Sequence, residues 1–399
     1  MTTPRVISIL NGLVFDGATD NLGEHPIHIR DGKIVGNEGP PEPGAEVLDA
    51  NRCVISPGLI DAHFHAFGAA LDLLKLEAMP SSYVTAHALR RLRRALNRGF
   101  TTIRDVAGGD LGIVRALEEE LFDGPRYLFT GRALTQTGGH ADPRPGDLDL
   151  SCGAGHMGEV VDGVDDLRRT VRERFRTGAH AIKIFTSGGV ISPSDPLRLC
   201  QYSTDEIRAV VDEAVRRDSY VAAHAYSPEA IRHAIDNGVR SIEHGNLIDA
   251  ETARAMADAK AFLVPTLIAY GAMEQRGAEL GLSRVGQAKN REVLEAGVGS
   301  LAIALDAGVP IGFGTDLMGD LETEQLHEFR LRLEASSPLE VLRSATSINA
   351  ELIRRPELGS LEIGSPADLV VFSGNPFEKP EVLWDERRTV IRQGRKVAA

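Results

Sequence analysis

The chain has 399 residues, of which 42% are hydrophobic and 25% are charged, so it can bury a substantial core and is not expected to be disordered. This length fits one large α/β domain with an appendage better than several small domains. The formal net charge of −13 repels phosphate groups, which excludes a general affinity for nucleic acid or anionic membranes and leaves a small-molecule substrate as the expected partner.

Cysteine spacing and the N-terminal segment indicate the expected compartment. Cys53, Cys152 and Cys200 are far apart and have no C-x-x-C spacing, so we predict reduced thiols rather than a disulfide framework or a thiolate zinc cluster. The N-terminal segment lacks the basic region and long apolar stretch of a signal peptide, and no later window resembles a membrane span. We therefore expect a cytoplasmic protein.

The two ends of the chain share one pattern. Residues 1–56 contain short apolar runs separated by turn residues, without a strong helical period, and residues 351–399 have the same character. We therefore predict a small β-sandwich domain that is built from both termini around a central insert.

The insert, residues 57–350, alternates strand-like apolar runs with amphipathic helical segments, which is typical of βα units around a parallel sheet. The eight strand candidates are residues 58–65, 101–108, 126–131, 181–188, 220–226, 240–245, 262–267 and 310–316. Their number, in an insert close to the usual size of about 250 residues, predicts a (β/α)8 TIM barrel. The alternative, a doubly wound open sheet, would need an early glycine-rich phosphate turn, and none is obvious.

Two segments of the insert have a distinct composition. Residues 87–99 interleave leucines and arginines at helical spacing, and we expect them to form a solvated outer helix face. Residues 135–163 are the longest stretch without a period. Because they follow the third strand candidate, we expect them to form part of the substrate pocket.

Two histidines, His63 and His65, lie one residue apart at the end of the first strand candidate. Residues i and i+2 of a strand point to the same side, about 6.6 Å apart along the chain, so both imidazoles can reach one metal ion at about 2.0–2.1 Å. On its own, the pair is also compatible with two polar residues on a wet strand face.

Four further residues of ligand type follow other strand candidates. Lys183, His224, His244 and Asp316 each lie near the C-terminal end of a separate candidate, where barrel enzymes keep their catalytic groups. Any one of them is compatible with a role in the core, although a buried lysine needs a partner. Their joint placement with the histidine pair instead predicts a metal site.

This pattern resembles the amidohydrolase superfamily, in its two-metal subtype with a carboxylated lysine, and the likeness covers essentially the whole chain. It implies two divalent metal ions that are bridged by a carbamate, formed by CO2 on Lys183. The resemblance assigns His63, His65 and Asp316 to one ion, and His224 and His244 to the other. Zinc is the expected metal, although the same ligands also suit cobalt, manganese and nickel.

Such a site would generate a nucleophile at neutral pH. Burial and nearby positive charge favour the neutral lysine amine, which can add CO2 and become an anionic ligand. Two divalent ions lower the pKa of a bridging water toward about 7, so the resemblance implies that a metal-bridging hydroxide attacks a polarised carbonyl. Asp316 would take the proton from this hydroxide and pass it to the leaving amine.

Two more residues are candidates for binding the developing oxyanion. His140 lies on the long loop, and Tyr226 lies two positions after His224, on the same strand face. A supporting or packing role is the alternative for each. The segments around both residues resemble the branch of the superfamily that contains Xaa-Pro dipeptidase-like enzymes and N-acyl amino acid hydrolases.

The expected activity is therefore hydrolysis of an amide bond in a dipeptide or N-acyl amino acid. Related sequences also cleave xenobiotic amides, thiocarbamates and phenylureas of the mycotoxin or herbicide type, so these substrates remain an alternative. A heterocycle deaminase is disfavoured, because no acid follows His224 at the required offset and because Lys183 is present. The complete ligand set disfavours a non-catalytic scaffold, and we expect a homo-oligomer, as is common among similar enzymes.

Overall fold

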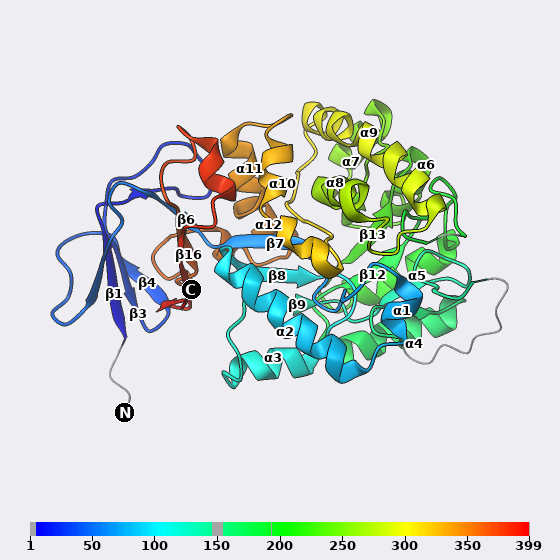
Figure 1. The fold of residues 1–399 in the computed structure, drawn as a ribbon, viewed down its shortest axis with the longest axis horizontal. Helices are drawn as coiled ribbons and strands as arrows, with labels where there is room; N and C mark the ends of the chain where they lie inside the picture. The colour runs from blue at the N-terminus through cyan, green and yellow to red at the C-terminus, as the bar shows by residue number, and fades with distance from the viewer. Residues whose placement is uncertain (1–4, 146–154, 193, 399) are drawn as a thin grey trace.

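A computed structural model describes residues 5–145, 155–192 and 194–398 of the chain. Parallel strands lie among helices in the larger part of the molecule, and mostly antiparallel strands lie at one end, where both chain termini are found (Figure 1). The expected α/β fold with a parallel sheet is confirmed.

Strands from both ends of the chain share one sheet. The four-stranded sheet β4-β3-β1-β5 comes from the N-terminal segment alone, whereas the five-stranded sheet β18-β17-β16-β6-β2 combines strands from both ends. Side chains from the two sheets, such as Ile9 and Leu369, belong to a single buried apolar cluster. The strands are β1 (Val6–Leu10), β2 (Leu13–Val14), β3 (Ile27–Arg30), β4 (Lys33–Gly36), β5 (Glu46–Asp49), β6 (Val54–Pro57), β16 (Leu369–Val371), β17 (Thr389–Arg392) and β18 (Arg395–Lys396).

The central strands form two parallel sheets, β7-β8-β9 and β11-β10-β12-β13-β14-β15. Several of these strands, such as β8 and β13, are buried at every position, as is typical of parallel strands that are covered on both faces. Seven of the eight strand candidates coincide with a strand in the structure. The strands are β7 (Leu59–Phe64), β8 (Phe100–Asp105), β9 (Arg126–Phe129), β10 (Ala133–Thr135), β11 (Gly158–Val160), β12 (Ile182–Phe185), β13 (Val221–Ala225), β14 (Ser241–His244) and β15 (Phe262–Val264).

The eighth candidate, residues 310–316, is not a strand, and that detail of the prediction was wrong. It makes one isolated bridge to β15 and then contributes hydrogen bonds to β7, including Ala62 N to Phe313 O at 2.9 Å. The left-handed backbone of Asp316, with φ of 53°, ends its extended course. Gly314 allows a close approach, since a Cβ there would lie 2.6 Å from the Cβ of His63. The segment therefore joins β15 and β7 without a regular ladder.

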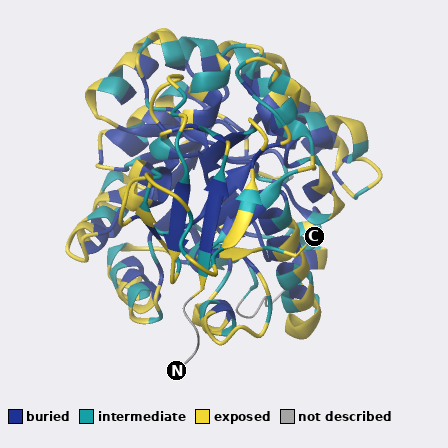
Figure 2. Ribbon diagram, turned by 90° about the vertical axis from the view of Figure 1, so that its left-hand side faces the viewer, coloured by how far each residue is buried: buried dark blue, intermediate teal, exposed yellow. Residues whose placement is uncertain are grey.

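Helices surround the central strands, and their outward sides are exposed while the interior segments are buried (Figure 2). They are α1 (Leu73–Glu77), α2 (Ser81–Asn97), α3 (Leu111–Glu118), α4 (Val164–Arg176), α5 (Thr204–Val215), α6 (Pro228–Ile235), α7 (Ala250–Asp258), α8 (Leu267–Arg276), α9 (Arg284–Asp306), α10 (His327–Arg332), α11 (Pro338–Ser344) and α12 (Ser347–Leu352), with 3-10 turns η1 (Gly319–Glu324), η2 (Pro356–Gly359) and η3 (Pro380–Trp384). Among the described residues, no helix is long and apolar enough to cross a membrane.

The basic segment 87–99 forms the predicted solvated face only in part, because Arg90, Arg93 and Arg94 are exposed whereas Arg91 and Arg98 are buried. Arg91 on α2 is 1% exposed and donates hydrogen bonds to the backbone carbonyls of Leu317 and Gly319. Arg98 is also buried and donates to the carbonyl of Glu322 at 2.9 Å. These arginines bind the segment that follows Asp316, so α2 holds that segment through its carbonyl groups.

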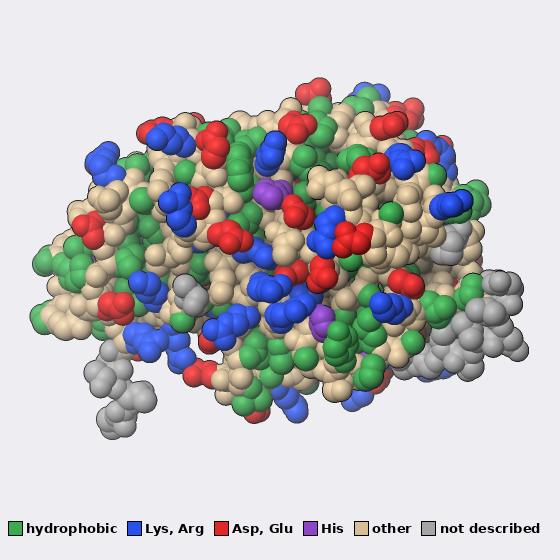
Figure 3. All heavy atoms as spheres, in the orientation of Figure 1, with side chains coloured by type: hydrophobic (Ala, Val, Ile, Leu, Met, Phe, Trp, Pro, Cys, Tyr) green, Lys and Arg blue, Asp and Glu red, His purple; other side chains and the backbone are tan. Residues whose placement is uncertain are grey.

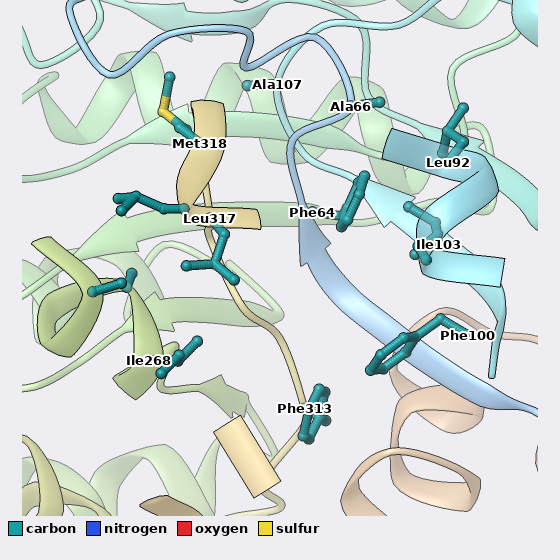
Figure 4. Packing of buried hydrophobic residues seen from close by; sticks show 14 of the residues in the cluster. Phe64, Ala66, Leu92, Phe100, Ile103, Ala107, Ile268, Phe313, Leu317 and Met318 are labelled. Carbon is teal, nitrogen blue, oxygen red and sulfur yellow. The ribbon is translucent and has the colours of Figure 1, made fainter. Parts of the chain in front are cut away.

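Aromatic rings pack the same region from the other side. The ring centroids of Phe100 and Phe313 are 5.6 Å apart, and those of Phe313 and Phe329 are 4.4 Å apart. Figure 4 shows Phe64 of β7, Phe100 of β8 and Phe313 of the segment after β15 in the same region of the core. This packing stabilises the irregular segment 310–316 beside β7.

The described residues on either side of 146–154 in the stretch 135–163 include regular structure that its lack of a period did not suggest. β10 and β11 pair in parallel between Ala133–Thr135 and Gly158–Val160. Residues 146–154, which include Cys152, lie outside the described part of the chain, and Cys53 and Cys200 are free thiols. On the face drawn in Figure 3, acidic and basic side chains are interspersed, so the net negative charge is not gathered into a single patch there.

Candidate active site

The predicted ligand residues come together at one end of the parallel strands. His63 lies on β7, with His65 just beyond it, and Lys183 lies on β12. The remaining three are His224 on β13, His244 at the last position of β14, and Asp316 in the segment between β15 and β7. All six line one pocket.

Asp316 lies among three of the histidines. Its Oδ1 is 2.8 Å from Nε2 of His65 and 3.3 Å from Nε2 of His63, and its Oδ2 is 3.8 Å from Nδ1 of His244. Burial alone would raise the pKa of this carboxyl group, but the charge and hydrogen bonds of the surrounding histidines outweigh burial and hold the pKa well below its usual range. Asp316 is therefore ionised at neutral pH.

His224 and His244 form the other side of the cluster. Their ring centroids are 4.5 Å apart, and both rings are buried. Nε2 of His224 lies 3.0 Å from the carbonyl oxygen of Gly188, whereas Nδ1 of His244 lies 2.8 Å from Oγ1 of Thr266. Each ring is therefore held by one nitrogen, which leaves the other nitrogen for a ligand.

Lys183 is 2% exposed, and its amine loses its proton more readily than the amine of a surface lysine. Burial lowers the pKa of its amine to about 8, although the negative charges of Glu243 and Asp316 act in the opposite direction. The neutral amine is therefore more abundant than on a surface lysine. Such an amine is the form that can react with CO2.

The donor set fits divalent metal ions. Imidazole nitrogens and a carboxylate oxygen are preferred by zinc and related ions, and ligand atoms of His63, His244 and Asp316 all lie within 4.8 Å of one another. Nδ1 of His65 is buried without a hydrogen-bond partner in the described structure. A cluster of four buried imidazoles beside one carboxylate and one amine has no evident role in packing. Bound cations would instead accept the lone pairs of its nitrogen and oxygen atoms.

Sequence reasoning did not identify two charged residues that support this cluster. Nδ1 of His63 lies 2.7 Å from Oε2 of Glu243, and Arg104 donates to Oε1 of the same carboxylate at 2.7 Å. All three side chains are buried. Opposite charges within two apolar strand candidates were the available signal, because a buried arginine and a buried glutamate need one another.

His140 and Tyr226 both line the pocket beside His224. The His140 ring stacks on the His224 ring with centroids 4.5 Å apart, and its Nδ1 lies 3.0 Å from Oγ of Ser192. The Tyr226 ring is also packed against His224, with centroids 4.9 Å apart. Both side chains therefore lie next to the cluster that the sequence assigned to metal binding.

The rest of the pocket wall is largely apolar. Its lining includes Leu71, Leu73, Met157, Phe185, Val190, Ile191, Met273, Met318 and Leu321. Among the described lining residues outside the predicted ligand set, Glu77 is the one Asp, Glu, Lys or Arg side chain. A substrate that fits this wall would present apolar groups to it.

Comparisons with known proteins are consistent with these observations. The sequence matches the amidohydrolase family over residues 54–397. It is 31% identical over 413 residues to ochratoxinase from Aspergillus niger, which covers 96% of this chain and 84% of the relative. Among solved structures, a prolidase complexed with N-methylphosphonate-L-proline is similar at 42% identity and a TM-score of 0.95, over 98% of this chain and 99% of the other. A Xaa-Pro dipeptidase with bound methionine in the active site is similar at 29% identity and a TM-score of 0.88, over 99% of this chain and 100% of the other.

A parallel α/β fold that carries ligand-type side chains at its strand ends defines a class of metal-dependent enzymes. Within that class, the chain belongs to the amidohydrolase family. The expectation of an amidohydrolase is therefore confirmed, whereas the roles of individual site residues stay predictions.

Proposed function

We propose that this amidohydrolase cleaves the amide bond of a dipeptide or an N-acyl amino acid. The observation that carries the proposal is the convergence of six ligand-type side chains on one largely apolar pocket. Its support from the comparisons is the similarity, over nearly the whole chain, to a prolidase and to a Xaa-Pro dipeptidase.

The proposed cofactors are two divalent metal ions, with zinc as the expected metal. One ion would be held by His63, His65 and Asp316, and the other by His224 and His244, with a carbamate of Lys183 between them. The carbamate forms when the neutral amine adds CO2 and releases a proton. When bound, the ions would supply Lewis acidity toward a carbonyl oxygen and toward water.

The side chains of the chain itself would move the proton and bind the substrate oxygen. Asp316 is ionised, so it can accept a proton from the attacking water and deliver it to the leaving nitrogen. His140 and Tyr226 line the same pocket, where either can donate a hydrogen bond to the oxygen that develops negative charge. The apolar wall would bind a hydrophobic side chain or acyl group.

A second candidate function is the hydrolysis of a xenobiotic amide, carbamate or phenylurea. The similarity to ochratoxinase favours this alternative, because the name of that enzyme refers to a mycotoxin. A heterocycle deaminase is a weaker alternative, since no acid follows His224 at the offset that such enzymes use.

We further propose that the parallel strands close into the (β/α)8 barrel of residues 57–350, with residues 1–56 and 351–399 as the β-sandwich domain. Backbone hydrogen bonds from residues 310–316 to both β15 and β7 support closure at that point. On the other side, the hydrogen bond from His180 N to Phe129 O, at 2.7 Å, joins the strand segments around β9 and β12. The homo-oligomer and the cytoplasmic location stay predictions of the sequence.

A substrate screen on metal-defined enzyme tests the proposed function. The purified protein would be stripped of metal and reloaded with zinc, cobalt, manganese or nickel in turn. Each form would then be offered dipeptides, N-acyl amino acids, carbamates and aryl ureas. Metal-dependent release of an amino acid from the first two classes is expected. Turnover restricted to carbamates or ureas would overturn the substrate assignment, and turnover by the stripped protein would overturn the metal requirement.

A further inference from the structure

A buried tyrosine connects His244 to the pocket residue Tyr226. Tyr270, on α8, is 1% exposed, and its hydroxyl lies 2.9 Å from the Tyr226 hydroxyl and 2.9 Å from Nδ1 of His244. Oγ1 of Thr266 lies 2.8 Å from the same nitrogen and 3.5 Å from the Tyr270 hydroxyl. Tyr226 lines the pocket, whereas Tyr270 is not among the described lining residues. These groups form a hydrogen-bonded chain that leads from the histidine to the pocket.

The position of the proton on His244 sets the direction of this chain. A neutral imidazole that binds a metal ion through one nitrogen carries its proton on the other. Nδ1 of His244 lies 2.8 Å from Thr266 Oγ1 and 2.9 Å from the Tyr270 hydroxyl, contacts much shorter than its 3.8 Å separation from Oδ2 of Asp316. Nδ1 is therefore engaged by the two hydroxyls, and Nε2 is the nitrogen left for an ion. Nδ1 then carries the hydrogen, and neither hydroxyl can donate to it.

The Tyr270 proton must therefore point elsewhere. Its two remaining neighbours are the Tyr226 oxygen at 2.9 Å and the Thr266 oxygen at 3.5 Å, and a bond between hydroxyls is normally about 2.7–2.8 Å long. The Tyr226 oxygen is thus the acceptor. Within the described residues, the Tyr226 hydroxyl has no other hydrogen-bond partner. Its own proton is left to point into the pocket.

We propose that Tyr270 is a positioning residue, which donates to the Tyr226 oxygen so that the Tyr226 proton is directed at the substrate. The inference rests on the proposed function, because it assumes that Tyr226 donates to the reacting carbonyl oxygen and that His244 binds a metal ion. A chain of hydrogen bonds with one direction also makes its last donor stronger. Tyr270 would therefore act on turnover without touching the substrate.

A double-mutant cycle measures this connection. With a substrate from the screen above, Tyr226→Phe is expected to lower kcat by about 100-fold, as for the loss of one oxyanion donor, and Tyr270→Phe by about 10-fold, with KM nearly unchanged in both. The double variant should be no slower than Tyr226→Phe alone. Tyr202→Phe, which removes a buried hydroxyl that donates to the Val161 carbonyl, serves as the matched control and should keep full turnover.

The outcomes separate the two proposals. Full activity of Tyr226→Phe would overturn the role of Tyr226 in the proposed function. A slow Tyr226→Phe beside a fully active Tyr270→Phe would overturn the present inference alone. Effects that multiply in the double variant would also overturn it, as would metal loss from Tyr270→Phe, since the tyrosine would then act through His244 itself.

Neutron diffraction on zinc-loaded, deuterium-exchanged crystals gives a readout that is independent of turnover. We expect deuterium on Nδ1 of His244, deuterium on Oη of Tyr270 directed at Tyr226, and deuterium on Oη of Tyr226 directed into the pocket. A Tyr226 deuterium that points at Tyr270 would contradict the proposed direction.

Discussion

Asp316 has two roles in the proposed chemistry, as a metal ligand and as a proton acceptor. Both roles depend on the position of its carboxylate, which its backbone conformation determines. Its left-handed conformation turns the carboxylate toward the histidines, while its backbone N–H donates to the His63 carbonyl at 2.8 Å. Asparagine tolerates the same conformation. A substitution by asparagine therefore tests the carboxylate with little change in backbone energy.

We predict that Asp316→Asn lowers kcat by about 100-fold to 10,000-fold, the usual contribution of a positioned acid or base, while the melting temperature of the metal-free protein stays close to that of the wild type. Steady-state kinetics and thermal unfolding measure the two effects. Asp110→Asn is a suitable control, because an asparagine can replace this N-cap of α3. Near-normal turnover of Asp316→Asn would contradict the proton-transfer role.

Lys183 permits a second test at the same scale. If its carbamate bridges two ions, Lys183→Ala should hold less metal than the wild type, which we expect to bind two ions per chain. Elemental analysis after gel filtration measures this ratio, and the exposed Lys379→Ala provides a control. Full loading of Lys183→Ala with two ions would be incompatible with a bridging lysine.

The sequence allowed the ligand-type residues to be selected, because strand ends of parallel sheets meet at one edge and each of these residues follows a different strand. It did not identify Glu243, Arg104 or Tyr270. Their significance depends on contacts across the sheet and from a helix, and no local spacing encodes such contacts. Charged residues within strands were a signal for the first two, whereas a tyrosine in a largely buried, apolar helix carries no such signal.

At the scale of secondary-structure elements, the buried ion pair ties strands together. Arg104 on β8 donates to Glu243 on β14, which in turn accepts from His63 on β7. Arg104 also donates to the backbone carbonyl of Ala62. The pair therefore connects the sheet β7-β8-β9 with the six-stranded sheet.

We predict that Arg104→Met lowers the free energy of unfolding by about 3–5 kcal/mol, because Glu243 is left as an unpaired buried charge. The double variant Arg104→Met/Glu243→Gln should be more stable than Arg104→Met, since it buries no unpaired carboxylate. Urea unfolding of the metal-free proteins measures both. The single variant Glu243→Gln completes the cycle. If the double variant loses the sum of the stabilities that Arg104→Met and Glu243→Gln lose separately, the two residues are not coupled and the prediction is wrong.

A second ion-pair network joins two outer helices. Glu213 on α5 accepts hydrogen bonds from Arg168 and Arg172 on α4, and these bonds lower its pKa to about 2. A carboxyl group with a depressed pKa stabilises the fold above its unfolded-state pKa of about 4.3, and this contribution is lost as the pH falls toward about 2.

Glu213→Gln should therefore cost about 1.5–3 kcal/mol at pH 7, and the cost should be about 1 kcal/mol smaller at pH 3.5. Urea titrations of the wild type and the variant at both pH values give this difference, in which other titrating groups cancel. The neighbouring Asp212→Asn, whose carboxylate is half exposed, should cost far less. If the stability cost of Glu213→Gln is the same at both pH values, the pKa of Glu213 is not lowered in the folded protein and the prediction is wrong.

The longer central strands were predictable, whereas the short strands β10 and β11 and the irregular segment 310–316 were not. Seven strand candidates were recognised from their apolar runs, but the course of residues 310–316 is fixed by close packing against β7 and by phenylalanine rings. Arg91 binds the carbonyl of Leu317 just beyond this segment. These influences come from distant parts of the chain. The inward turn of Arg91 was missed for the same reason, since its helix shows an ordinary amphipathic pattern and its partners are backbone carbonyls.

At the scale of the whole molecule, the proposed ligands come from five separate segments between positions 63 and 316. These segments meet only in the folded chain, so the unfolded chain offers no comparable site. Ions that bind only the folded state stabilise it by about 4 kcal/mol when their concentration is about 1,000 times Kd. Metal binding and folding should therefore be linked.

We predict that stripping the metal with a chelator lowers the melting temperature by several degrees, at about 1 °C per kcal/mol for a chain of this length, and that reloading zinc restores it. Differential scanning calorimetry at fixed protein concentration measures the shift. The variant His63→Ala/His65→Ala should lose most of the response to zinc, whereas His25→Ala, with a histidine far from the pocket lining, should keep it. An equal response in all three proteins would place the zinc effect elsewhere on the molecule and would separate metal binding from the folded arrangement of the strand ends.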